Sequence, residues 1–175
     1  MASFFIGIAG GSGTGKTVLA KELKKHFGRK AKIFNFDKYQ RFGEKLPLLY
    51  GMKNWDCPRA IKWEKLYKDL ISLKKKKGIV IIEGYLLFYK LAVRRLLNFR
   101  VFLTASEKIR VKRRTKFKDE KYIQKVLLPM HKKYIEPTKK FADLVLDTEK
   151  YSITRVAAKV KKRIYSLCPS NAPKR

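Results

Sequence analysis

The segment from Phe4 to Thr17, FFIGIAGGSGTGKT, constrains the fold of this chain more than any other. A short apolar run leads into the pattern GxxxxGK[ST], which Gly10, Gly15, Lys16 and Thr17 satisfy. In such a loop, backbone N–H groups converge on phosphate oxygens, the lysine reaches the β and γ phosphates, and the hydroxyl ligates Mg²⁺. The segment therefore predicts a buried strand, a phosphate-binding loop (P-loop) and a helix that begins at the loop.

The residues expected to contact a nucleotide are those of the loop itself: Gly10, Gly11, Ser12, Gly13, Thr14, Gly15, Lys16 and Thr17. The alternative is a flexible glycine turn before a helix, but the apolar strand before the loop and the helix after it favour the P-loop. A dinucleotide fingerprint, GxGxxG, is not satisfied, because Lys16 or Val18 stands where the third glycine would be.

Apolar runs and helical stripes alternate along the rest of the chain. This alternation predicts a three-layer α/β fold, with a parallel sheet flanked by helices, in one domain over residues 1–168 and a disordered tail at 169–175. Further strands are expected near residues 33–36, 79–82, 99–103 and 144–146. Helices are expected at 18–27, 63–73, 86–97 and 153–167. One further helix is expected to begin at Ser106, and another to run to about residue 136 with a kink or break at Pro129. Residues 41–56 are expected to form a mobile connection.

The composition indicates which partners and which compartment to expect. The chain has 44 Lys and Arg against 14 Asp and Glu, a net charge of +30, which attracts polyanions. The lysines are spread along the sequence, which favours solvated surfaces, with a non-specific nucleic-acid contact as the alternative. Two distant cysteines predict neither a zinc site nor a disulfide framework. With no apolar run long enough for a membrane helix, we expect a cytoplasmic protein without a membrane partner; the sequence carries no signal for an oligomeric state.

Two acidic residues follow predicted strands. Asp37 comes after the second strand and Glu83 after the run at 79–82, so both should lie with the P-loop at the carboxyl edge of the sheet. Asp37 could orient or deprotonate an acceptor hydroxyl, and Glu83 could hold Mg²⁺ directly or through water. An Asx turn is the alternative for Asp37, and an exposed strand-end acid is the alternative for Glu83.

These groups favour phosphoryl transfer over other uses of a nucleoside triphosphate. The base-specificity motif NKxD of switch GTPases is missing from the sequence, and motor ATPases are usually larger. Residues 107–120 are rich in Arg and Lys and have the composition of a lid that closes over phosphates. A solvated helix face is the alternative for this segment.

Several motifs, in order, resemble the uridine kinase family of P-loop nucleoside and riboside kinases. They are GGSGTGKT, FDKY, NWDCPRAIKW, IVIIEGYLLF and LPMHKKYIEPTKKFADLVL. The resemblance covers the chain from Ile6 to about Leu146. It implies transfer of the γ phosphate of ATP or GTP, with Mg²⁺, to the 5′-hydroxyl of a ribonucleoside, foremost uridine or cytidine.

The resemblance also implies roles for single residues. Asp37 would be the base near the acceptor hydroxyl, with Lys16 on the phosphates, and Asp56 and Tyr39 would bind the nucleoside. Thr17 and Glu83 would form the magnesium site. Arg114, together with Arg110 and Arg113, would supply the lid arginines.

One departure concerns the acceptor. Uridine kinases usually carry a base-contacting β-hairpin between the segments that correspond to Leu73 and Ile79, where this chain has only a lysine run and Gly78. In this compactness it is similar to nicotinamide riboside kinases. A kinase of another small metabolite, such as pantothenate or a sugar phosphate, and an RNA-binding or RNA-end-acting protein with a P-loop fold are the alternatives that the sequence leaves open.

Overall fold

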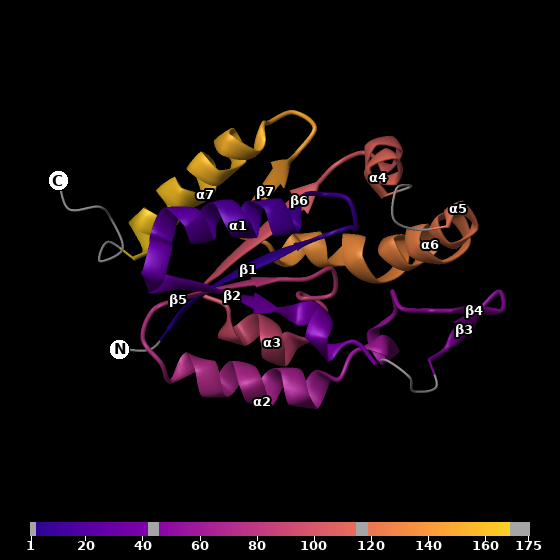
Figure 1. Ribbon diagram of the computed structural model, residues 1–175, viewed down its shortest axis with the longest axis horizontal. Coiled ribbons are helices and arrows are strands. Elements are labelled where there is room, and N and C mark those ends of the chain that lie inside the picture. Colours follow the sequence, from indigo (N-terminus) through magenta and orange to yellow (C-terminus); the bar gives the residue numbers. More distant parts are fainter. Residues whose placement is uncertain (1–2, 42–45, 115–118, 169–175) are drawn as a thin grey trace.

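The computed structural model describes residues 3–41, 46–114 and 119–168. Its centre is a parallel sheet of five strands in the order β2-β5-β1-β6-β7. The strands are β1 (Phe4–Gly10), β2 (Ala31–Asn35), β5 (Ile79–Glu83), β6 (Phe99–Thr104) and β7 (Leu144–Asp147). Helices cover both faces (Figure 1), so the predicted three-layer α/β architecture is confirmed.

β1 occupies the middle of the sheet, between β5 and β6. Its side chains alternate between the two faces: Ile6 and Ile8 join one hydrophobic cluster, whereas Phe5 and Ala9 join the other. All four are fully buried. Burial on both faces explains why this strand is an almost continuous apolar run in the sequence.

One face of the sheet is covered by α1 (Lys16–Phe27) and α7 (Ile153–Leu167), which lie side by side in Figure 1. Leu19 and Leu23 of α1 and Val156 and Val160 of α7 are fully buried against the sheet. Both helices follow the predicted apolar stripes. Gly28, with φ 56°, ends α1, since a glycine adopts this left-handed conformation without a steric penalty.

The other face is covered by α2 (Trp63–Lys74) and the short α3 (Leu91–Leu96). The helix predicted over residues 86–97 is wrong in its first half, because residues 85–90 form turns and α3 begins only at Leu91. Leu86, Leu87 and Phe88 are all fully buried. Three consecutive buried side chains do not fit one face of a helix at the edge of a core, so this stretch enters the core as a turn.

A longer helical segment precedes β7, and Ile135 in its later part is buried in the same cluster as Leu66 of α2 and Val93 of α3. It consists of α5 (Glu120–Tyr122), the π-helical η4 (Ile123–Leu127), α6 (Leu128–Met130), the π-helical η5 (His131–Ile135) and the 3₁₀-helical η6 (Glu136–Phe141). The predicted break at Pro129 takes the form of one π turn before α6 and one after it. A proline lacks the N–H for the regular helical bond, and π turns are one way to absorb that loss.

The predicted mobile connection at 41–56 contains more structure than expected. β3 (Leu48–Leu49) and β4 (Met52–Lys53) form a small antiparallel hairpin, turned by Tyr50 and Gly51 with φ of 51° and 73°. The hairpin projects at one end of the molecule (Figure 1). Two-residue turns with positive φ at both positions match the twist of paired strands. Residues 42–45 of this connection lie outside the described residues.

Short 3₁₀ segments complete the fold: η1 (Gly28–Lys30), η2 (Phe36–Tyr39) and η3 (Pro58–Ala60). The helix expected after Ser106 is α4 (Glu107–Arg114). The last part of the predicted lid, residues 115–118, and the predicted disordered tail at 169–175 lie outside the described residues. Within the described parts of the chain, no helix is long and apolar enough to cross a membrane.

Candidate nucleotide and acceptor site

The loop between β1 and α1 is held together by its own side chains. The Thr14 hydroxyl and the Lys16 ammonium both donate hydrogen bonds to the carbonyl of Gly11, at 2.8 and 2.9 Å. Gly13 has φ 83°, and a Cβ there would lie 2.7 Å from the carbonyl oxygen of Arg110. Only glycine fits at this position without a shift of the neighbouring backbone.

A cavity of about 680 Å³ lies beside this loop, at the carboxyl edge of the sheet. Its lining combines the loop and the start of α1 with residues from four other parts of the chain: Ser12, Gly13, Gly15, Lys16, Thr17, Val18, Asp37, Gln40, Trp55, Asp56, Glu83, Gly84, Tyr85 and Arg114. The structure therefore brings together most of the residues that the sequence predicted. Gly10, Gly11 and Thr14 lie behind this surface, and Thr14 is almost fully buried.

Thr17 and Glu83 meet at one side of the cavity. The Thr17 hydroxyl donates a hydrogen bond to Oε1 of Glu83 at 3.1 Å. Burial raises the pKa of the Glu83 carboxyl, although the nearby Lys16 ammonium and the Thr17 hydroxyl oppose that shift. Burial also lowers the pKa of Lys16, with Glu83 and Asp37 acting in the opposite direction.

A hydroxyl and one carboxylate beside a phosphate loop are the protein ligands that Mg²⁺ typically uses when it also binds phosphate oxygens and water. Thr17 and Glu83 fit that ion. No group of three or more His, Cys, Asp and Glu suited to an all-protein metal cage occurs within residues 3–41, 46–114 and 119–168. The donor set thus suits a metal that arrives with the nucleotide.

Asp37 lies at the same edge because of the strand register. β2 pairs with β5 so that Asn35 stands opposite Glu83, and Asp37 follows two residues beyond. The Asn35 side chain accepts a hydrogen bond from the Asp37 N–H at 2.9 Å, which begins η2. The side chain that makes this Asx turn is that of Asn35, whereas Asp37, for which an Asx turn was the alternative, contributes its N–H. The Asp37 carboxylate remains exposed and lines the cavity, so the turn and a chemical role are compatible.

Asp56 lines the far end of the cavity and is held by two neighbours. Its N–H donates to the Asn54 side chain at 3.1 Å, and one carboxylate oxygen accepts a hydrogen bond from the Tyr122 hydroxyl at 2.7 Å. Burial and the Asp56 charge raise the pKa of Tyr122, so the phenol keeps its proton. The same hydroxyl accepts from the Trp55 N–H at 3.2 Å. Asp56 is thereby fixed with its carboxylate toward the cavity.

Sequence reasoning missed Tyr122 and five residues of the lining: Val18, Gln40, Trp55, Gly84 and Tyr85. Gln40 donates to the Tyr85 hydroxyl at 2.9 Å, and this hydroxyl donates to the Trp55 carbonyl at 2.7 Å. These bonds join parts of the chain that are 30 to 45 residues apart. Trp55 and Tyr85 stand inside the motifs NWDCPRAIKW and IVIIEGYLLF, but no periodicity in the sequence indicates that these residues and Gln40 are hydrogen-bonded partners.

Tyr39, expected to bind the acceptor, lies elsewhere. Its ring is buried and stacks on Phe34 at 5.4 Å, and its hydroxyl donates to Asp69 of α2 at 2.5 Å. It does not line the cavity, where Gln40 stands in its place. The physical reason is the η2 turn: it directs Tyr39 toward α2 and presents the next residue to the cavity.

The three arginines of α4 have different surroundings. Arg114 lines the cavity. Arg113 donates to the Gly13 carbonyl at 3.1 Å and to the hydroxyl and carbonyl of Thr148 at 3.1 and 3.2 Å. Arg110 is buried behind the loop, where its Nη1 and the His131 ring would both clash with a Cβ on Gly11. Arg110 therefore supports the P-loop from behind.

His131 also lies behind the loop, and sequence reasoning did not single it out. Burial and the nearby Arg110 lower the pKa of its imidazole to about 4, so the ring is neutral at physiological pH. Its Nε2 lies 3.0 Å from Oε2 of Glu136, and a neutral ring donates there. The His131 and Arg110 side chains thus fill the space that the glycine at position 11 leaves open.

The fold and this cavity define the class: the protein is a P-loop kinase. The family model described as AAA domain matches residues 6–136. Among solved structures, a shikimate kinase from Acinetobacter baumannii in complex with shikimate superposes with a TM-score of 0.63 at 20% identity and covers 94% of both chains. A structure described as a possible uridine kinase from Bacillus stearothermophilus gives 0.57 at 20% identity over 84% of this chain and 90% of that one. At this identity, these two establish the fold alone.

Curated relatives identify the family more narrowly. A uridine kinase of Clostridium perfringens (strain SM101 / Type A) is 30% identical over 198 aligned positions, covering 90% of this chain and 94% of the relative. A uridine kinase of Geobacillus sp. (strain WCH70) is 28% identical and covers 81% and 84%. The chain belongs to the uridine kinase family.

The alignment also bears on the missing hairpin. The aligned span of 198 positions exceeds the full length of this 175-residue chain. The relative therefore has residues within that span that this chain lacks. In the structure, residues 75–78 alone connect α2 to β5, which agrees with the compactness read from the sequence.

Proposed function

We propose that this protein transfers the γ phosphate of ATP or GTP to the 5′-hydroxyl of a ribonucleoside, with uridine and cytidine as its acceptors. The observation that carries the proposal is one cavity that combines the P-loop with two separate carboxylates, Asp37 and Asp56. A nucleotide-binding loop alone suits many activities. A loop facing two carboxylates suits transfer to a molecule that presents several hydroxyls.

The donor side would work as follows. Backbone N–H groups of the loop and Lys16 bind the phosphates, and Mg²⁺ held by Thr17 and Glu83 would neutralise charge on them. Arg114 lies on the same cavity wall and adds a cation toward the transferred group. The lowered pKa of Lys16 reflects a partly desolvated ammonium, and charge interactions are stronger where water is excluded.

On the acceptor side, the exposed Asp37 would accept a hydrogen bond from the reacting hydroxyl and orient it in line with the phosphate. Asp56, fixed by Tyr122 and Asn54, would accept hydrogen bonds from the ribose hydroxyls. Trp55 and Tyr85 line the cavity beside Asp56, and their rings offer an apolar surface for a planar base.

A second acceptor class is favoured by the short connection at residues 75–78. Without the hairpin that usually reads the base, nicotinamide riboside or another small riboside becomes a candidate substrate. Both candidates use the same loop, the same carboxylates and the same reaction. They differ only in what lies against Trp55 and Tyr85.

A panel of acceptors tests the proposal. Uridine, cytidine, adenosine, nicotinamide riboside, pantothenate and ribose 5-phosphate would each be incubated with ATP or GTP and Mg²⁺, and ADP or GDP release would be followed. Turnover of uridine or cytidine at the highest kcat/KM is expected. Turnover of nicotinamide riboside alone would establish the second candidate, and acceptor-independent hydrolysis with all six would contradict riboside phosphorylation. Lys16→Ala is the control, because it should abolish any turnover at this loop.

A further inference from the structure

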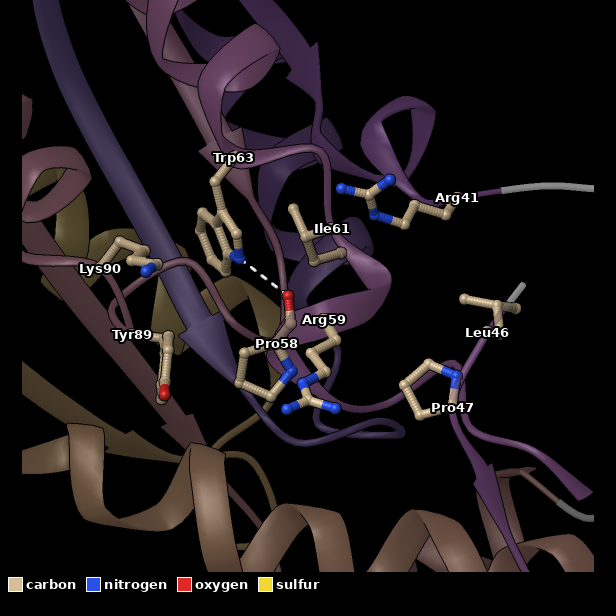
Figure 2. Close-up of a pocket in the computed structure, with 9 residues that line it drawn as sticks. All are labelled: Arg41, Leu46, Pro47, Pro58, Arg59, Ile61, Trp63, Tyr89 and Lys90. Atoms are coloured by element: carbon tan, nitrogen blue, oxygen red, sulfur yellow. Dashed lines mark hydrogen bonds between the residues drawn. The ribbon is translucent and has the colours of Figure 1, made fainter. Parts of the chain in front are cut away.

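A second cavity, of about 650 Å³, lies outside the catalytic cavity. It is bounded by the segment from Pro58 to Trp63 on one side and by Tyr89 and Lys90 on another (Figure 2). The two cavities share no lining residue among those that the structure describes. Nothing in the proposed transfer reaction uses this second space.

Its lining is cationic. Arg41, Arg59 and Lys90 contribute to the wall, and the described lining contains no Asp or Glu. The catalytic cavity differs sharply, since Asp37, Asp56 and Glu83 all line it. The second cavity therefore suits an anion that arrives without a metal ion, because it offers arginine and lysine donors and no carboxylate ligand.

The same wall carries two aromatic rings. Trp63 and Tyr89 lie 6.1 Å apart between ring centroids, with an angle of 32° between the planes. The Trp63 indole is fixed by a hydrogen bond from Nε1 to the Pro58 carbonyl at 2.8 Å (Figure 2) and by edge contact with Phe36. Tyr89 packs edge-on against Tyr134. Both rings are partly exposed, so they present an oriented aromatic surface beside the cations.

An aromatic surface next to several cations matches one ligand chemistry: a planar base joined to a chain of phosphates. We propose that the cavity lined by Arg59, Trp63, Tyr89 and Lys90 is a second nucleotide site that binds a nucleoside triphosphate without Mg²⁺. Its base would lie against Trp63 and Tyr89, and its phosphates would contact the basic side chains. This site goes beyond the kinase reaction and does not depend on which riboside is phosphorylated.

The two tryptophans make the test direct, because the chain has only two and each lines a different cavity. In Trp55→Phe, the sole indole is Trp63. ATP titrated into this variant in excess EDTA should quench its fluorescence saturably, and the quench should persist when Lys16→Ala is added to disable the P-loop. No quench, or a quench that Lys16→Ala removes, would overturn the proposal.

Reversing charges at the second cavity tests whether its basic side chains bind the phosphates of ATP. Within the Trp55→Phe, Lys16→Ala protein, Arg59→Glu with Lys90→Glu should weaken ATP binding about tenfold or more. The matched control reverses two exposed lysines elsewhere, Lys32 on β2 and Lys162 on α7, which changes the net charge equally. Equal Kd values for the two double variants would overturn the proposal. If the reversed variant fails to fold, Arg59→Gln with Lys90→Gln gives the same comparison.

Two further probes separate the parts of the ligand. Inorganic tripolyphosphate should bind Trp55→Phe, Lys16→Ala more weakly than ATP, because it lacks the base. Uridine, which lacks the phosphates, should leave the Trp63 emission unchanged at concentrations that saturate with ATP. Tripolyphosphate affinity equal to that of ATP would contradict a nucleotide site.

Discussion

The hydroxyl of Thr17 donates a hydrogen bond to the carboxylate of Glu83 across 3.1 Å, joining the start of α1 to the end of β5. The contact spans 66 positions of sequence. It brings a hydroxyl and a carboxylate together beside the phosphate loop, where both could hold Mg²⁺.

Thr17→Ala and Glu83→Gln should each lower kcat about 10- to 100-fold at moderate Mg²⁺ and shift the Mg²⁺ concentration for half-maximal rate upward, because each removes an oxygen that holds the ion or its water. Initial rates against Mg²⁺ at saturating nucleotide measure this. Glu64→Gln on the exposed side of α2 is the control and should leave the curve unchanged. Mg²⁺ curves of both variants identical to wild type would contradict the metal role.

Asp37→Asn should lower kcat about 10²- to 10⁴-fold, since an amide cannot take the acceptor proton. The KM for the nucleotide should change little, because Asp37 lies on the acceptor side of the cavity. Steady-state kinetics with both substrates varied separates the two effects. Full activity in this variant would remove Asp37 from the reaction.

Tyr122→Phe should raise the KM for the riboside several-fold to about tenfold while kcat and the nucleotide KM stay close to wild type, because the lost 2.7 Å hydrogen bond holds Asp56 in place. Asp56→Asn should do the same more strongly. Tyr67→Phe, which also removes one hydroxyl but on partly exposed α2, is the matched control. An unchanged riboside KM in Asp56→Asn would contradict its contact with the acceptor.

Glu83→Gln should also stabilise the nucleotide-free protein. Burial raises the pKa of this carboxyl in the fold above its ordinary 4.5. The folded state is therefore more stable at low pH, where the carboxyl is protonated, and it loses that stability as the pH rises through the raised pKa. At neutral pH the variant should melt a few degrees above wild type, and the difference should vanish near pH 4. Thermal denaturation across pH 4 to 8 measures this; a constant difference would indicate another cause.

Lys16→Met tests the same effect of burial on stability for a cationic side chain. Burial lowers the pKa of Lys16, so the charged form is disfavoured in the fold, and the inactive variant should melt at or above wild type. Together the two results would mean that the chain gives up stability at its reactive groups.

The sequence predicted the parts of this site that follow short-range rules. Gly15, Lys16 and Thr17 could be placed because the loop motif fixes their spacing, and Asp37 and Glu83 because they lie at or just after the carboxyl ends of β2 and β5. Tyr122 could not be placed, because its bond to Asp56 joins positions 66 residues apart that no local pattern relates.

The errors in secondary structure have one cause in common. Residues 86–88 have helical composition, but complete burial of three neighbouring side chains places them in a turn. Tyr39 belongs to a recognisable motif, but one 3₁₀ turn directs it toward Asp69. In both places tertiary packing outweighs local preference, and a single sequence carries little information about that packing.

The central position of β1 has a consequence for how the chain acquires its activity. β1 precedes the other four strands of the sheet in the sequence, yet its partners are β5 and β6, and the Phe5 N–H is paired with a side chain 93 residues away. The phosphate loop attached to β1 therefore cannot take its final shape until synthesis has passed Thr104. Before that point the apolar run at Phe4–Gly10 lacks both neighbours, so the nascent chain depends on late strands, or on chaperones, to protect the segment that later binds the nucleotide.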